Sequence, residues 1–152
     1  MRVLLVEDNE EKARQIVEIV EGTGVAKADI ISVRGLRAAY PAIQRGGWRL
    51  IILDMTLHAA EGAFSASSKE SLAGIEVLQA LQARGDTTPV IVATQHDVFE
   101  QDFLYFPDVD ALDTALQEAF PFNYRGTVRV RLGSEPWRIE MRRRIAEIVG
   151  GR

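Results

Sequence analysis

The feature that most constrains this chain is a run of four large aliphatic residues, Leu50–Leu53, that ends in the carboxylate of Asp54. A continuous apolar run of this length predicts a strand buried on both faces, as in the interior of a parallel sheet. Open α/β sheets place their ligand crevice at the carboxyl ends of the strands. Because a carboxylate buried without partners costs several kcal/mol, we expect Asp54 at the mouth of a central strand, with polar partners.

Two other segments repeat this pattern of an apolar run followed by a polar residue. Arg2–Val6 leads into Glu7 and Asp8, and Val90–Ala93 leads into Thr94. Segments with helical spacing of apolar residues separate these strands, and such alternation predicts βαβ units with right-handed crossovers. We predict helices over 9–21, 36–44, 74–84 and 108–120, a further strand over 29–33, and a last helix capped by Ser134.

These elements predict one α/β domain over residues 1–152. The expected architecture is a doubly wound, flavodoxin-like sheet of five parallel strands in the order 2-1-3-4-5, with helices on both faces. In the first helix, the apolar spacing predicts that Ala13, Ile16, Val17 and Val20 face the core. The fold class therefore follows from the periodicity of the apolar residues.

The fifth strand has two candidate positions. Thr127–Leu132 alternates apolar residues with arginine, as a half-exposed edge strand does, and this alternation turns Arg131 away from the core. The rival segment is Asp102–Phe106, which precedes Pro107. We favour the first position because it lets the chain end on its fifth helix.

Composition excludes several classes of protein. The chain is 47% hydrophobic and 26% charged, as ordinary globular domains are, and it holds no cysteine for disulfides, thiolate metal sites or thiol catalysis. No apolar run approaches the ~20 residues of a membrane span, and the first residues predict a strand instead of a signal peptide, so we expect a cytoplasmic protein. Residues 121–152 carry 8 Arg against 3 Glu, which we interpret as a solvated helix face, and we do not expect nucleic-acid binding.

The polar residues at the strand ends form a candidate site. In a parallel sheet all carboxyl ends meet at one edge, so Glu7, Asp8, Asp54 and Thr94 are expected to converge. Neighbouring carboxylates repel one another unless a cation joins them. Carboxylate oxygens, a backbone carbonyl and water are the ligands that Mg²⁺ accepts. The pattern therefore predicts a Mg²⁺ site at this edge.

These residues resemble the receiver domain of bacterial two-component response regulators, most closely over residues 1–94. The resemblance implies that Asp54 is the phosphoacceptor and that Glu7, Asp8, Asp54 and the carbonyl of Thr56 hold Mg²⁺. It also implies that Thr94 is the switch hydroxyl that meets the phosphoryl group. The chemistry agrees, because Asp54 is a carboxylate nucleophile and Mg²⁺ offsets the charge of the phosphoryl oxygens.

Three departures make this an atypical receiver. The family's lysine after the fifth strand is missing, since no lysine follows Lys69. Arg131 is the nearest substitute on the favoured register, and Lys69 could reach the site from an insertion at about 57–72. The glycine that the family places soon after the phosphoacceptor corresponds here to Gly74, which lies twenty positions after Asp54. From about residue 95 the chain diverges.

Two functions are consistent with these observations. The first is a stand-alone receiver that accepts a phosphoryl group on Asp54 with Mg²⁺ and acts by binding another protein. Its enzymatic activity is at most self-phosphorylation from a phosphodonor and slow autodephosphorylation. The alternative is a pseudo-receiver, an interaction module that works without phosphorylation. The resemblance implies a histidine kinase or phosphotransfer protein as donor and an unidentified downstream protein, and it leaves a homodimer open.

Overall fold

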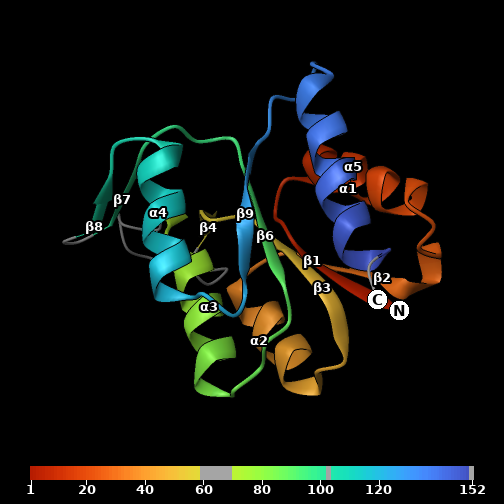
Figure 1. Cartoon of the computed structure of the whole chain (residues 1–152), viewed down its shortest axis with the longest axis horizontal. Helices are drawn as coiled ribbons and strands as arrows, with labels where there is room; N and C mark the ends of the chain where they lie inside the picture. The colour runs from red at the N-terminus through yellow and green to blue at the C-terminus, as the bar shows by residue number, and fades with distance from the viewer. Residues whose placement is uncertain (59–69, 102–103, 151–152) are drawn as a thin grey trace.

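A five-stranded parallel sheet forms the centre of the protein in the computed structural model, which describes residues 1–58, 70–101 and 104–150 (Figure 1). The strand order is β2-β1-β3-β6-β9, and every neighbouring pair is parallel. This confirms the predicted order 2-1-3-4-5 and the flavodoxin-like fold. The strands are β1 (Arg2–Val6), β2 (Ile30–Val33), β3 (Trp48–Leu53), β6 (Val90–Thr94) and β9 (Tyr124–Arg129).

Helices cover both faces of this sheet (Figure 1). Apolar residues of β1, β3 and β6 alternate between two separate cores, so each strand is buried on both sides, as its continuous apolar sequence predicts. One core lies under α2 (Leu36–Arg45), α3 (Ala73–Ala83) and α4 (Val109–Ala119). The other lies under α1 (Glu10–Gly22) and α5 (Pro136–Val149), and a short 3-10 helix (Lys27–Asp29) leads into β2.

Helix α1 buries a different set of residues from the set that the sequence predicts. Ile16 and Val20 are buried as expected, but Ala13 and Val17 are only partly buried. Lys12 and Ile19 are fully buried in addition. The inward stripe is therefore rotated toward Lys12, which brings a lysine side chain to the carboxyl end of the sheet.

The fifth strand is β9, beside β6, so the favoured position is confirmed with a shift of three residues toward the N-terminus. Val128 and Val130 are buried and Arg131 is exposed, as the alternation predicts. The rival strand at 102–106 is wrong. Its described part belongs to a separate antiparallel pair of β7 (Phe99–Gln101) and β8 (Leu104–Phe106), and residues 102–103 lie outside the described residues.

The predicted insertion at 57–72 begins and ends in two short antiparallel strands, β4 (Leu57–His58) and β5 (Glu70–Ser71). Residues 59–69 lie outside the described residues. Across this connection, the amide of Gly74 donates to the carbonyl of Met55 at 3.0 Å. Gly74 thus returns to the residue after Asp54 although it lies twenty positions along the chain.

Close packing at Gly74 generates a first prediction. A Cβ at this position would lie 2.9 Å from Cα of Met55 and 3.0 Å from its sulfur, which is closer than side chains pack. Gly74→Ala is therefore expected to lower the free energy of unfolding by about 1–3 kcal/mol, as overpacking does. Urea unfolding measures the change. Gly35→Ala is the control, because a Cβ there meets no atom within 4 Å, and equal losses in both variants would contradict this account.

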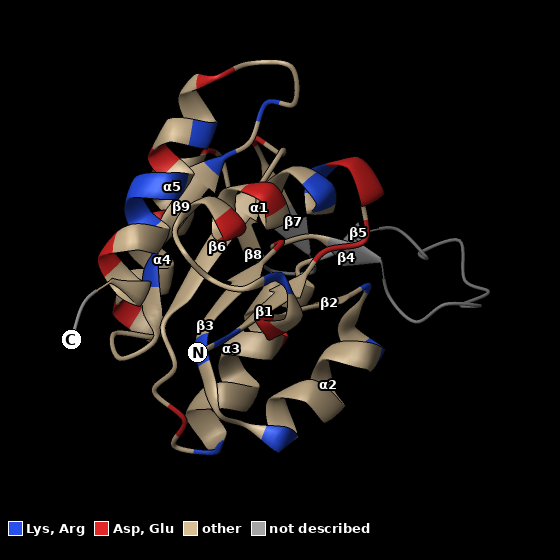
Figure 2. Cartoon of the chain, turned by 90° about the vertical axis from the view of Figure 1, so that its right-hand side faces the viewer, with Lys and Arg blue, Asp and Glu red and all other residues tan. Residues whose placement is uncertain are grey.

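The last helix begins later than expected. Pro136 is in its first turn, as predicted, but Glu135 precedes the helix, and Ser134 is not its cap because the Ser134 hydroxyl donates to the carbonyl of Arg131 at 3.1 Å. Arginines of α5 pair with acidic residues one turn away, Arg143 with Glu147 at 3.0 Å among them. Figure 2 shows basic and acidic residues interspersed along this helix. No helix in the described part of the chain is long and apolar enough to span a membrane.

A buried tyrosine ties β9 to α4. The hydroxyl of Tyr124 donates to Oδ1 of Asp113 at 2.6 Å and also contacts the hydroxyl of Thr127. The ring is 1% exposed, and burial together with the Asp113 carboxylate raises the pKa of Tyr124 above its ordinary value. The unfolded chain therefore ionises this group at a pH where the folded protein does not.

Tyr124→Phe is expected to lower the free energy of unfolding by about 1 kcal/mol at pH 7, the typical contribution of one hydrogen bond. The native state keeps the Tyr124 proton above pH 10 while the unfolded state loses it. The advantage of wild type over Tyr124→Phe should therefore shrink as the pH rises beyond about 10, by about 1.4 kcal/mol per unit. Urea unfolding of both proteins between pH 7 and 11 measures this difference. A difference that stays constant would contradict the raised pKa.

Candidate metal and phosphoryl site

The backbone ladder places two carboxylates side by side. Val6 of β1 lies opposite Leu53 of β3, and the next residues, Glu7 and Asp54, extend the same ladder. The amide of Asp54 donates to the carbonyl of Val6 at 3.1 Å, and the amide of Glu7 donates to the carbonyl of Val33 at 3.0 Å. The hydrogen bonding of the sheet therefore fixes both residues at its carboxyl edge, where the sequence predicts them.

Three carboxylates converge at this edge. Glu7, Asp8 and Asp54 each offer an oxygen atom, and these oxygens lie within 4.8 Å of one another. Glu7 is 1% exposed and Asp54 6% exposed, while Asp8 is partly buried. The Oε1 atom of Glu7 is buried, and it faces the ammonium of Lys12. Hard oxygen donors gathered this closely suit Mg²⁺, so the residues present fit the ion that the sequence predicts.

Lys12 supplies a cation to the same cluster from α1. Its Nζ atom lies 2.6 Å from Oε1 of Glu7 and 3.3 Å from Oδ2 of Asp54, and it donates a hydrogen bond of 2.8 Å to the carbonyl of Ala93. The side chain is 0% exposed. Lysine is almost never fully buried unless it is paired. The three neighbouring oxygens supply that pairing, from the ends of β1, β3 and β6.

The first turn of α1 holds Lys12 in this position. The side chain of Asn9 caps the helix by accepting from the amide of Lys12 at 2.9 Å. The amide of Asn9 in turn donates to Oε2 of Glu7 at 3.1 Å. Glu7, Asn9 and Lys12 therefore form one connected unit, which aims the lysine at Asp54.

Burial raises the pKa of both inner carboxylates. Desolvation raises the pKa of Glu7 to about 7 and also raises that of Asp54, while the positive charge of Lys12 opposes both shifts. The native state thus keeps a proton on Glu7 at a pH where the unfolded chain, with the ordinary value of 4.5, has released it. Without a metal, the contribution of Glu7 to the free energy of unfolding therefore falls as the pH rises from 4.5 to about 7.

Asp54 and Thr56 share a tight turn. Oδ1 of Asp54 accepts from the amide of Thr56 at 3.2 Å, which leaves Oδ2 facing Lys12. The hydroxyl of Thr56 is buried and has no hydrogen-bond partner among the described residues. The structure therefore holds Thr56 directly beside the carboxylate of Asp54, next to the acidic cluster.

Thr94 ends β6, as predicted, and is fully buried. Its hydroxyl accepts from the amide of His96 at 3.2 Å, and its carbonyl accepts from the amide of Val130 at 2.7 Å. Because a hydroxyl both accepts and donates, Thr94 keeps its own hydrogen for another acceptor. Its predicted role as a switch stays a prediction.

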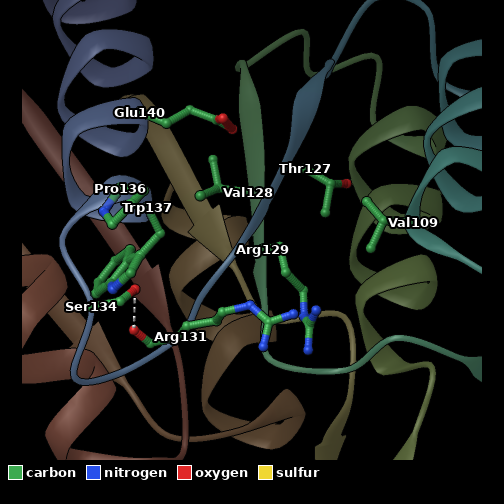
Figure 3. Close-up of a pocket in the computed structure, with 9 residues that line it drawn as sticks. All are labelled: Val109, Thr127, Val128, Arg129, Arg131, Ser134, Pro136, Trp137 and Glu140. Carbon is green, nitrogen blue, oxygen red and sulfur yellow. Dashed lines mark hydrogen bonds between the residues drawn. The ribbon is translucent and has the colours of Figure 1, made fainter.

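The two candidate phosphoryl contacts are placed differently. Arg131 is exposed, and it lines a pocket of about 410 Å³ between β9 and the start of α5. Figure 3 shows its side chain extending away from Trp137. This pocket shares no lining residue with the acidic cluster. Lys69 lies outside the described residues. A contact from either residue to a phosphoryl group stays a prediction.

Comparisons with known proteins point to one class. The chain is 27% identical over 152 residues to the Detocs response regulatory protein DtcB of Enterobacter cloacae (strain JD6301), covering 97% of this chain and 100% of that protein. A receiver domain from Rhodospirillum rubrum matches with a TM-score of 0.67 at 15% identity, over 100% of this chain and 96% of its own. The Mn(2+)-bound form of response regulator Rcp1 matches with a TM-score of 0.57 at 20% identity, over 99% and 94%.

These likenesses define the fold. The chain has the fold of response-regulator receiver domains, with the acidic cluster of Glu7, Asp8 and Asp54 at the carboxyl edge of its sheet. No protein-family model matches the sequence. The similarity to DtcB extends over nearly the whole chain, including the part beyond residue 95.

Sequence reasoning missed Lys12 as a site residue. A lysine in the first turn of a helix ordinarily points to solvent, because its stem is flexible and its charge is strongly hydrated. The available signal is its spacing, since Lys12, Ile16 and Ile19 follow one another at four and three residues and so share a face. That face is the buried one.

The charge imbalance at this site generates a stability prediction. The ammonium of Lys12 contacts Glu7 and Asp54, and Asp8 adds a third carboxylate to the cluster. We therefore expect the charged form of Asp54 to destabilise the fold without a metal. Asp54→Asn keeps an oxygen for the amide of Thr56 and removes the charge. It is expected to raise the free energy of unfolding by about 1 kcal/mol in EDTA at pH 7.5, measured by urea unfolding.

Asp86→Asn is a matched control for this change. Oδ1 of Asp86 also accepts from an amide two residues on, that of Thr88, at 2.9 Å. The control variant is expected to show no stabilisation, because Asp86 is not part of the acidic cluster. Destabilisation by Asp54→Asn in EDTA would contradict the prediction, because it would show that Lys12 already balances the charge of Asp54.

Proposed function

We propose that the protein is a stand-alone receiver of two-component signalling that accepts a phosphoryl group on Asp54. The observation that carries this proposal is the convergence of Glu7, Asp8 and Asp54 within 4.8 Å at the carboxyl edge of a receiver-type sheet. The likeness to DtcB, which is named a response regulatory protein, supports it. The acceptor is a carboxylate at the mouth of the central strand β3.

The reaction is a phosphoryl transfer to the Asp54 carboxylate. A carboxylate oxygen of Asp54 attacks phosphorus, the bond from phosphorus to the donor breaks, and the donor keeps the electron pair of that bond. The donor atom is a nitrogen of a phosphohistidine, or the bridging oxygen of acetyl phosphate, which leaves as acetate. The product is an acyl phosphate on Asp54, which water hydrolyses slowly.

We infer that Mg²⁺ binds among Glu7, Asp8, Asp54 and the carbonyl of Thr56. When bound, it supplies charge neutralisation for the phosphoryl oxygens. The donor set fits this ion, and the Rcp1 structure, described as Mn(2+)-bound, shows that a protein of the same fold accepts a divalent metal. Thr94 is the candidate switch residue, because its buried hydroxyl at the end of β6 can still donate to a phosphoryl oxygen.

The proposed partners follow from the class of protein. A histidine kinase or a phosphotransfer protein in the cytoplasm would supply the phosphoryl group. The output would be binding to another protein, either an unidentified downstream partner or a second copy of this chain. Among the described residues the exposed large apolar side chains include Val98, Leu104 and Tyr105, on and beside the β7–β8 pair, which offers a surface for such contacts.

Incubation with acetyl phosphate and Mg²⁺ tests this function. Wild type is expected to gain the mass of one phosphoryl group, and the gain should be lost in Asp54→Asn and with EDTA. Asp8→Asn should weaken Mg²⁺ binding and slow the reaction by about tenfold or more, because it removes a charged ligand. Intact-mass spectrometry follows the product, and Asp86→Asn is the control, expected to react as wild type does.

One observation favours the alternative pseudo-receiver. Lys12 already contacts Glu7 and Asp54, so part of the charge that a metal neutralises is balanced within the fold. A wild-type protein that gains no phosphoryl group from acetyl phosphate or from a phosphorylated histidine donor would support this module, which binds its partner without phosphorylation.

A further inference from the structure

We propose that Lys12, delivered from the first turn of α1, is the ammonium that contacts the phosphoryl group on Asp54. The inference rests on the proposed function and assigns the positive charge that this function needs. A phosphoryl group adds about two negative charges to the site. Glu7, Asp8 and Asp54 already place three carboxylates there, so the product needs a second cation besides Mg²⁺.

The position of Nζ supports this role. Its 3.3 Å separation from Oδ2 of Asp54 is longer than a typical charge-assisted hydrogen bond of about 2.8 Å. Nζ also donates a hydrogen bond to the carbonyl of Ala93, the residue before Thr94, and lies 2.6 Å from Oε1 of Glu7. The ammonium therefore lies between the nucleophilic carboxylate and the end of β6, on the side of Asp54 that the amide of Thr56 leaves open.

The position of Lys12 is also expected to destabilise the fold, which argues against a purely structural role. A positive charge in the first turn of a helix opposes the helix dipole, which favours acidic residues such as Glu10 and Glu11 at that end. Full burial adds the cost of desolvating the ammonium. Residues that break local preferences of this kind are expected at functional sites.

Among the described residues, Lys12 is the cation best placed to contact a phosphoryl group on Asp54. In the fifth-strand segment, the side chains that enter the core under α1 and α5 are the uncharged Val128 and Val130. The guanidinium of Arg129 binds the carbonyl of Gln95 and the carboxylate of Asp97. Of the described residues, Lys12 is the one whose cationic group contacts the carboxylate of Asp54.

Lys12→Met tests the proposal, because methionine matches the unbranched stem and adapts to a buried site. Beryllofluoride serves as the phosphoryl mimic, and its affinity is measured by ¹⁹F NMR at a Mg²⁺ concentration that saturates each protein. We expect the affinity of Lys12→Met to fall by about tenfold to a hundredfold, the value of a hydrogen bond to a charged group. Lys27→Met, which removes an exposed lysine, is the control and should bind as wild type does.

A second readout separates this role from structural damage. Mg²⁺ affinity in the absence of beryllofluoride should stay the same or rise in Lys12→Met, because the variant loses a positive charge beside two of the carboxylates. A structural defect would weaken both ligands. Unchanged beryllofluoride affinity in Lys12→Met would overturn the proposal and leave Lys12 as a counter-ion for the metal-free site.

The wild type decides the question if Lys12→Met fails to fold. The chain holds three lysines, Lys12, Lys27 and Lys69, so ¹³Cε-lysine labelling gives three signals that Lys27→Met and Lys69→Met assign. The Lys12 signal is expected to shift when beryllofluoride is added to the Mg²⁺-bound protein, and a signal that stays in place would overturn the proposal. If wild type neither binds beryllofluoride nor accepts a phosphoryl group, the proposed function fails with it. If wild type binds beryllofluoride and the Lys12 signal stays in place, the role of Lys12 is overturned and the proposed function is retained.

Discussion

The buried contact among Lys12, Glu7 and Asp54 is the interaction on which this site depends. A sheet of this type brings carboxylates to one edge, and burial makes their charge expensive unless a cation accompanies it. Lys12 joins the ends of three strands by contacting Glu7, Asp54 and the carbonyl of Ala93. It thereby couples the position of helix α1 to the charge state of the candidate phosphoacceptor, and it allows the cluster to exist before a metal binds.

Much of this fold could be predicted from the sequence because its strands are buried on both faces. The continuous apolar runs that end at Glu7, Asp54 and Thr94 predict β1, β3, β6 and the edge at which the site lies. The fifth strand was harder to place because Tyr124 and Gly126 interrupt the alternation that marks an edge strand. Tyr124 is nevertheless fully buried, since its hydroxyl reaches Asp113 on α4, and this pairing depends on tertiary structure that no local pattern shows.

The site itself was predictable only in part. The acidic residues could be found because each directly follows a strand, so their convergence is a property of parallel sheets. Lys12 could not be assigned in the same way, because the direction of a long flexible side chain is decided by what the rest of the fold places around it. Gly74 shows the same limit. Its return to Met55 becomes visible only when β4 and β5 bring the two ends of the insertion together.

A crystal structure of the wild type with Mg²⁺ and beryllofluoride tests the central claim most directly. The account predicts beryllofluoride on a carboxylate oxygen of Asp54, Mg²⁺ ligated by Asp8, Asp54 and the Thr56 carbonyl with Glu7 close by, and Nζ of Lys12 within hydrogen-bond distance of a fluorine atom. A metal bound away from Asp54, or beryllofluoride met by another cation while Lys12 keeps only its contacts with Glu7 and Ala93, would contradict it.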